Sequence, residues 1–302
     1  MSDQTSRDKL QEIEAARTSV MDEGRPDAVA KRRAQGMATA RERIEQFVDR
    51  DSFREVGALV EPDRSNELNR DLVAPADGVI TGTGKVAGRE VSIIAQDFTV
   101  YGGSIGTAAD LKAGRLVQRG LERGLPMVMM LEGGGHRIQD GMNAAHFAAA
   151  SPIFHTISKM SGWVPNVVAI MGQGFAGPTA YASLGDFVVM IRGKSTMGIA
   201  GPALVKAGTG LDITKEELGG AKRQADEQGI ADLAVDTEEE CLEAIQKFLS
   251  YLPQNAGQPL PIIPCDDPVD RQDDKLLDLV TANSRKVYDV RKVIKSIADV
   301  DS

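Results

Sequence analysis

Short apolar segments alternate with amphipathic, helix-like segments over the middle of the chain. The apolar segments are five or six residues long and show no polar alternation, which is typical of strands buried on both faces of a sheet. Strands that alternate with helices indicate crossover connections and a mostly parallel sheet. The predicted strands are 126–131, 167–171, 187–191 and 230–235, and the predicted helices lie at 107–124, 142–150, 215–228 and 237–251.

The first 100 residues have a different pattern. Residues 6–48 are charged and mostly helical, and Thr39 with Glu42 forms a capping box that opens a short helix. This segment is interpreted either as a solvated arm, or as an arm that packs on a partner or lends Arg41 or Arg43 to a phosphate. Residues 60–76 read as a loop. A β-hairpin is predicted after it, with strands at 78–86 and 90–97.

Near the C-terminus, five prolines fall between positions 253 and 268 and indicate an extended connector. A last helix is predicted at 284–298. The expected organisation is therefore a helical arm (1–50), a core (51–252) and a connector with a C-terminal helix (253–302).

Composition restricts the class of protein. A net charge of −9 argues against a nucleic-acid binder, whose contact surface is basic. The two cysteines have no metal-ligand spacing and indicate no disulfide framework, so no metal site is expected. The sequence shows neither a secretory leader nor an apolar stretch of membrane-spanning length, so a cytoplasmic location is expected.

The candidate chemistry lies in three glycine-rich junctions, each between a predicted strand and a predicted helix. They are 133–135, 174–177 and 198–201. Ligands of parallel sheets bind at the carboxyl ends of the strands, and amides at a helix start can hold an anion or an oxyanion. The alternative reading is tight turns and close helix–strand packing. The run 133–135 lacks the G-x-G-x-x-G spacing, which residues 172–177 do have. No P-loop motif is present, and none of the junctions is interpreted as a nucleotide-binding fingerprint.

The side chains provide fewer candidates for catalysis than the backbone does. His146 and His155 are interpreted as structural, whereas His136 flanks the first glycine loop, where its amide matters more than its ring. Residues 102–106 fit G-x-S-x-G as letters, but no nucleophile elbow of a serine hydrolase is expected. Capping or loop bracing is the preferred role for the acidic residues near strand ends, and Arg137 could either bind an acidic ligand or brace its loop. The acidic residues are Asp97, Glu132, Asp140 and Asp186. These features favour an α/β enzyme whose polar groups are mostly backbone, suited to a thioester enolate.

Several motifs in order along the chain resemble one known family. Residues 36–44 are similar to G-K-x-T-A-R-E-R-I and 77–82 to D-G-V-V-T-G, 96–106 are similar to Q-D-F-T-V-x-G-G-S-x-G, and 132–141 stand where the family has S-G-G-A-R-I-Q-E-G. Further matches lie at 51–55, 197–202, 217–221, 249–253 and 287–294. The chain thus resembles the N-terminal half of the carboxyltransferase (β) component of biotin-dependent acyl-CoA carboxylases and decarboxylases, in the crotonase superfamily.

The resemblance implies a crotonase-like spiral of ββα units and a carboxyl group passed between biotin and an acyl-CoA. It assigns enolate stabilisation to Gly134, Gly135, His136 and Gly177. It places the CoA thioester near the remaining loop residues and Arg41. These residues are Gly133, Ala176, Gly198, Ile199 and Gly201.

The resemblance also implies partners. Biotin is carried on a partner protein, the biotin carboxyl carrier protein, and the biotin-side half of the site belongs to another chain or to a missing part of this one. A homo- and hetero-oligomer is expected.

One departure from the family pattern is Pro178, which stands where the family has a second glycine and carries no amide hydrogen. This departure keeps open a CoA-binding scaffold without catalysis. A biotin-independent thioester decarboxylase is a separate alternative.

Overall fold

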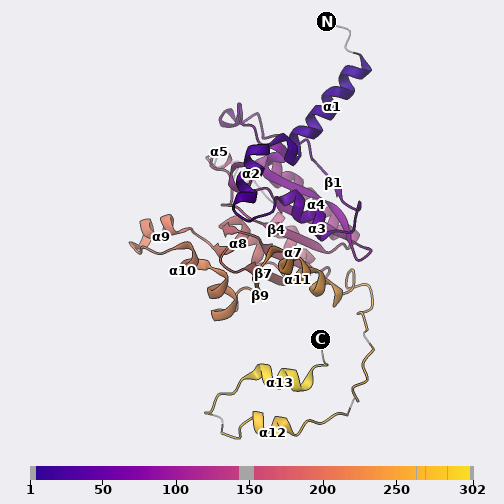
Figure 1. The fold of residues 1–302 in the computed structure, drawn as a ribbon, viewed down its shortest axis with the longest axis vertical. Helices are drawn as coiled ribbons and strands as arrows, with labels where there is room; N and C mark the ends of the chain where they lie inside the picture. The colour runs from indigo at the N-terminus through magenta and orange to yellow at the C-terminus, as the bar shows by residue number, and fades with distance from the viewer. Residues whose placement is uncertain (1–4, 143–152, 263, 269, 284, 300–302) are drawn as a thin grey trace. The chain divides into compact units, whose positions relative to one another are not determined.

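A computed structural model of the protein describes residues 5–142, 153–262, 264–268, 270–283 and 285–299. The chain divides at residue 260 into two compact units. The first unit, shown in indigo to orange in Figure 1, is an α/β structure around a seven-stranded sheet with strand order β1-β2-β3-β4-β5-β7-β9. The strands are β1 (Arg54–Glu55), β2 (Val79–Val86), β3 (Arg89–Gln96), β4 (Met127–Leu131), β5 (Asn166–Ile170), β6 (Gln173–Phe175), β7 (Phe187–Ile191), β8 (Thr196–Gly198) and β9 (Leu233–Val235).

The helices of the described residues agree with most of the predicted ones. They are α1 (Ser6–Val20), α2 (Pro26–Ala34), α3 (Ala40–Phe47), α4 (Thr107–Arg123), α5 (Ile138–Gly141), α7 (Ile153–Met160), α8 (Gly177–Ala182), α9 (Pro202–Thr209), α10 (Lys215–Gly219), α11 (Glu238–Ser250), α12 (Lys275–Leu279) and α13 (Val290–Ile297). The capping box of Thr39 and Glu42 is present at the start of α3. The helix predicted at 142–150, and His146 within it, lie outside the described residues.

The sheet is antiparallel at one edge and parallel elsewhere. The predicted hairpin is confirmed, since Val79 pairs with Gln96 and Val86 with Arg89 across β2 and β3. From β3 onward each neighbour is parallel. After β5 and β7 the chain adds a second short strand before its helix, and these strands, β6 and β8, pair in a separate parallel sheet. The result is a series of ββα units, as the resemblance implies.

Both faces of the parallel strands are buried, because alternate residues of each strand enter different cores. On β4, Met127, Met129 and Leu131 pack in the core that contains buried residues of α4, α7 and α8. Val128 and Met130 pack in the other core, which contains buried residues of α3 and α11. This arrangement explains the continuous apolar strand segments of the sequence.

The N-terminal arm is only partly solvated. Helix α1 is exposed along most of its length, and it projects away from the sheet in Figure 1. By contrast, α3 buries Ile44 and Phe47 in the core shared with α11, and Arg32 of α2 is buried. The interpretation of the arm as a solvated segment is therefore wrong for α3 and for Val29 and Arg32 of α2, while the rest of α2 is exposed or half-buried.

Two other predictions need correction. The helix predicted at 215–228 ends at Gly219 and resumes as a π-helical turn at Lys222–Glu227. A Cβ on Gly219 would lie 1.8 Å from the carbonyl oxygen of Met197, so the chain at the end of α10 lies in close contact with the backbone of Met197. Of the strand predicted at 230–235, only the last three residues form a strand, β9.

The second unit comprises residues 261–302, of which α12 and α13 are the helices. The predicted terminal helix, 284–298, is shorter than expected and begins at Val290. Helix α12 was not predicted. Over the residues that the structure covers, no helix has the length and apolar character needed to cross a membrane.

Candidate functional site

The first glycine loop follows β4 and lies against the segment before α4. The amide of Ile105 donates to the carbonyl of Gly135 (2.8 Å), and the amide of Arg137 donates back to the carbonyl of Ile105 (2.8 Å). These two bonds flank half-buried His136 and fix its backbone. The approach is close, because a Cβ on Gly103 would lie 2.0 Å from the carbonyl oxygen of Glu132. Gly103 and Gly133 are therefore required by backbone contact between the two loops.

The second loop reaches the first through Gly135. This glycine has φ +91°, and a Cβ built on it would lie 3.1 Å from the Cβ of Ala176 and 3.3 Å from the amide nitrogen of Gly177. Ala176 itself has φ 62° and ψ −110°, a conformation that costs on the order of 1–3 kcal/mol for a residue with a side chain. Strain of this kind at a loop tip is found at functional sites. Here it sets the position of the Gly177 amide.

The third loop is connected to the second. The amide of Ala176 donates to the carbonyl of Gly198 (2.8 Å), and the ring of Phe175 lies beside Gly198 and Gly201. Ile199 is 78% exposed next to this contact. The second and third junctions follow β6 and β8 rather than the long strands, because the chain turns after β5 and β7 and forms the small second sheet.

The structure thus brings the loop residues predicted from the sequence into one connected set. The polar groups of this set are main-chain amides. Among the described residues, the N–H groups of Gly134, Gly135 and Gly177 have no hydrogen-bond acceptor, and Gly177 is the first residue of α8, where an amide has no partner within the helix. Pro178 follows and contributes no donor, so the second loop offers the Gly177 amide alone at this point.

Arg137 braces the first loop. Its guanidinium forms a buried ion pair with Asp77 and also donates to the backbone carbonyl of Asp77 (3.2 Å). The other carboxylate oxygen of Asp77 accepts the amide of Ala109 in the first turn of α4 (2.8 Å). Burial raises the pKa of Asp77, and the charge of Arg137 acts against this shift. Of the two roles considered for Arg137, the structure supports bracing.

The acidic residues near strand ends also act as braces. Asp97 binds Arg25 (2.7 Å) and Asp140 accepts from Asn69 (3.0 Å). Asp186 accepts the amide of Asn166 (2.8 Å). Glu132 is buried between two arginines.

The hydrogen bonds of Arg41 go to residues outside the glycine loops. It donates to both carboxylate oxygens of Glu55 (2.8 and 3.1 Å) and to the carbonyl of Val20. Binding of a CoA phosphate would require Arg41 to exchange this partner, and its assignment stays a prediction. Arg43 is 2% exposed and is held by Glu132 and Glu238, which excludes it as a surface ligand of a phosphate. His155 is exposed on α7.

Two features were missed at the sequence level. Asp77 belongs to the site through Arg137, and Arg32 with Glu238 completes the surroundings of Glu132. Asp77 precedes a glycine before a strand, a signal that indicates only a turn. No local signal joins Arg32 to Glu132, because the two residues are 100 positions apart.

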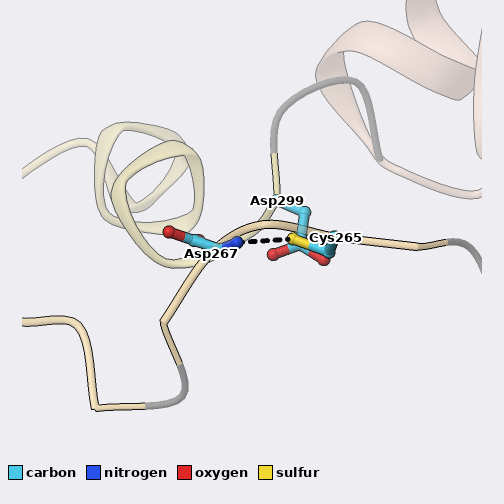
Figure 2. A group of neighbouring side chains, drawn as sticks. All are labelled: Cys265, Asp267 and Asp299. Carbon is cyan, nitrogen blue, oxygen red and sulfur yellow. Dashed lines mark hydrogen bonds between the residues drawn. The ribbon is translucent and has the colours of Figure 1, made fainter.

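A separate group of possible metal ligands lies in the second unit. One ligand atom each of Cys265, Asp267 and Asp299 falls within 4.8 Å of the others (Figure 2). The amide of Asp267 donates to the Cys265 sulfur (3.3 Å), as the dashed line shows, and its carboxylate pairs with Arg271 (2.9 Å). Exposed carboxylates with such partners are common without a metal. The group therefore provides no evidence for a metal site.

Comparison with known proteins identifies the domain. The model of the family described as "Carboxyl transferase domain" matches residues 31–302. The chain belongs to this family. It is 37% identical over 300 residues to the carboxyltransferase subunit of a propionyl-CoA carboxylase from Haloferax mediterranei, covering 99% of this chain and 57% of that one. It is 34% identical to the alpha subunit of a methylmalonyl-CoA decarboxylase from Veillonella parvula, covering 98% and 58%.

The fold of the carboxyl transferase domain is confirmed by solved structures. A transcarboxylase 12S structure with hydrolysed methylmalonyl-coenzyme A bound superimposes with a TM-score of 0.85 at 33% identity, over 98% of this chain and 57% of that chain. The chain thus spans a little over half the length of these relatives. The crotonase-like α/β fold expected from the motifs is the observed one.

Proposed function

We propose that this carboxyl transferase domain binds an acyl-CoA thioester and stabilises its enolate while a carboxyl group moves between the thioester and biotin. The observation that carries the proposal is the contact of two loop tips, where Gly135 lies against Gly177 and both amides lack an acceptor among the described residues. Two donors from separate loops are what an oxyanion needs. The relatives named above include a propionyl-CoA carboxylase subunit and a methylmalonyl-CoA decarboxylase subunit.

The chemistry follows from where charge develops. When the α-carbon of the thioester loses a proton or a carboxyl group, the electron pair moves onto the thioester oxygen. Amides of Gly134, Gly135, His136 and Gly177 are the proposed donors to this oxygen. One such donor is typically worth about 10²–10³ in kcat. The donors are fixed in advance, because each loop is held by backbone bonds and by the buried pair of Arg137 and Asp77.

The loop residues fit a biotin-dependent reaction, since the groups they bring together are backbone donors and a half-buried histidine. Carboxylated biotin, when bound, would supply the carboxyl group, and the biotin left behind could take the proton from the α-carbon. We propose that biotin arrives on a carrier protein and that a biotin-side half, on the same polypeptide or on a second chain, closes the site in an oligomer. Binding of the CoA moiety is assigned to Gly133, Ala176, Gly198, Ile199, Gly201 and Arg41.

A label-transfer assay tests this function. The protein is purified with its biotin-side partner and incubated with methylmalonyl-CoA labelled in its free carboxyl group, in the presence of free biotin or the biotinylated carrier. We expect label on biotin, and we expect avidin to abolish the transfer.

The same assay distinguishes the two alternatives. A biotin-independent decarboxylase would release labelled CO2 at an unchanged rate with avidin present. A non-catalytic scaffold would bind the CoA thioester in equilibrium dialysis but neither transfer nor release the label. Either result would contradict the proposed function.

A further inference from the structure

Glu132 lies buried beneath the first glycine loop, between two arginines of the N-terminal arm. It is the last residue before the loop and is 3% exposed. Arg32 of α2 binds both of its carboxylate oxygens, one at 2.7 Å, and Arg43 of α3 binds Oε2 at 2.8 Å. The guanidinium of Arg32 also lies over the ring of Phe98, 5.2 Å from its centroid. A carboxylate of the loop is thus held by two helices that are remote in sequence.

The ion pairs continue to α11 and balance in charge. Arg43 binds Glu238 through Nη2 (2.7 Å) and Nε (3.3 Å), and Glu238 also accepts the amide of Ala38 (3.1 Å). Burial alone would lower the pKa of Arg43, but the hydrogen bonds and charges of Glu238 and Glu132 outweigh it and raise the pKa. Two arginines therefore face two glutamates in the interior, and each carboxylate has several donors, as a buried charge requires.

Glu132 also touches the start of the second loop. A Cβ on Gly172 would lie 2.2 Å from Oε1 of Glu132, so the carboxylate packs directly on that glycine. The amide of Gly133 donates to the carbonyl of Gln173 (2.6 Å), one residue further on. The carboxylate therefore lies between the segment that leads from Gly133 to the first loop tip and the segment that leads from Gly172 to the second.

We infer that Glu132 is a positioning residue for the reaction, which sets the spacing of the two loop amides and is itself fixed by Arg32 and Arg43. The inference rests on the proposed function, since it assigns the arm helices a part in the same oxyanion site. Glu132 touches neither the substrate nor the reacting atoms. Its effect is on the transition state, where the two donors must act together, rather than on binding of the CoA moiety.

The test compares kcat and KM for the acyl-CoA in the assembled complex. Glu132→Gln keeps the shape of the side chain and removes its charge. We expect kcat to fall at least tenfold while KM changes less than threefold. Arg32→Met is expected to show the same split and Arg32→Lys to recover most of kcat, since lysine restores the charge. Arg33→Met is the matched control, because Arg33 lies on the same helix and pairs with Glu42 on the surface.

The outcomes separate the two proposals. If the wild-type complex transfers no carboxyl group to biotin, the proposed function fails. If the wild type is active and Glu132→Gln retains its kcat, the positioning role fails. Should Glu132→Gln not fold, the pair Arg32→Met and Arg32→Lys decides: equal kcat values in these two variants, per folded chain, would overturn the inference.

Discussion

Alanine at Gly135 provides the sharpest test of the oxyanion site. The glycine has φ +91°, and the methyl group of alanine would lie 3.3 Å from the amide nitrogen of Gly177 and 3.1 Å from the Cβ of Ala176. Both distances are shorter than ordinary contact. The substitution therefore strains the backbone at one donor and crowds the other, and the amides of Gly135 and Gly177 must move relative to each other.

The magnitude follows from these two effects. A positive φ costs a residue with a side chain about 1–2 kcal/mol, which lowers Tm by roughly 2–4 °C per kcal/mol in a domain of 150–250 residues. Loss of one oxyanion donor typically reduces kcat by about 10²–10³, equivalent to roughly 2.7–4 kcal/mol in the transition state. Gly135→Ala should thus lower kcat by at least 100-fold while most of the protein stays folded.

The assay measures kcat of carboxyl transfer in the assembled complex, with Tm from thermal unfolding. Gly162→Ala is the control for strain alone, because Gly162 has φ +72°, open space around it and a place before β5, at the opposite edge of the sheet. It should lower Tm by a similar amount and keep kcat. If folded Gly135→Ala turns over within threefold of wild type, the backbone amides at this contact are not the enolate donors.

Three further outcomes are expected. Pro178→Ala adds an amide hydrogen in the first turn of α8. The free energy of unfolding measured in urea should fall by about 0.4–1 kcal/mol. A tenfold rise in kcat would show that an oxyanion donor was missing at this position. Burial lowers the pKa of Lys112 from 10.5 to about 8, so the unfolded chain holds the proton more tightly between these values. The free energy of unfolding of the wild type, relative to that of Lys112→Met, should therefore rise with pH by up to roughly 3 kcal/mol between pH 8 and 10.5. If urea unfolding gives the same difference between the two proteins at both pH values, the lowered pKa of Lys112 is contradicted. Burial raises the pKa of the Cys241 thiol to about 12, so iodoacetamide should modify Cys265 alone. Rapid alkylation of Cys241 in the Cys265→Ser variant would be inconsistent with this packing.

Much of the fold follows from local sequence signals. The strand at 187–191 and the helix starting at Thr107 agree with their predicted positions, because a continuous apolar segment and an amphipathic repeat are each determined locally. The convergence of the glycine loops also follows, since parallel strands end at one edge. The small sheet of β6 and β8 was not foreseen. Its strands are three residues long and include glycines, so they carry no strand signal.

Contacts between distant segments set the limit of prediction for the site. Helix α10 ends where the backbone of Met197 lies against Gly219, and nothing near Gly219 in the sequence reveals that contact. The same holds for Glu132, whose two arginines lie in a part of the chain that reads as a charged surface segment. A buried arginine and an exposed one look alike in a sequence. The charge pattern of the arm thus concealed its structural role.

The buried arginines also determine where this polypeptide can be cut. A fragment of residues 51–252 would contain Glu132 and Glu238 but neither Arg32 nor Arg43, so both carboxylates would lose the cations that hold them. An unpaired buried charge costs several kcal/mol, against a total stability of about 5–15 kcal/mol for a typical domain. The shortest autonomous unit must accordingly start no later than Pro26. Recombination of such domains between homologous proteins has to transfer residues 26–47 together with the β4 strand and α11.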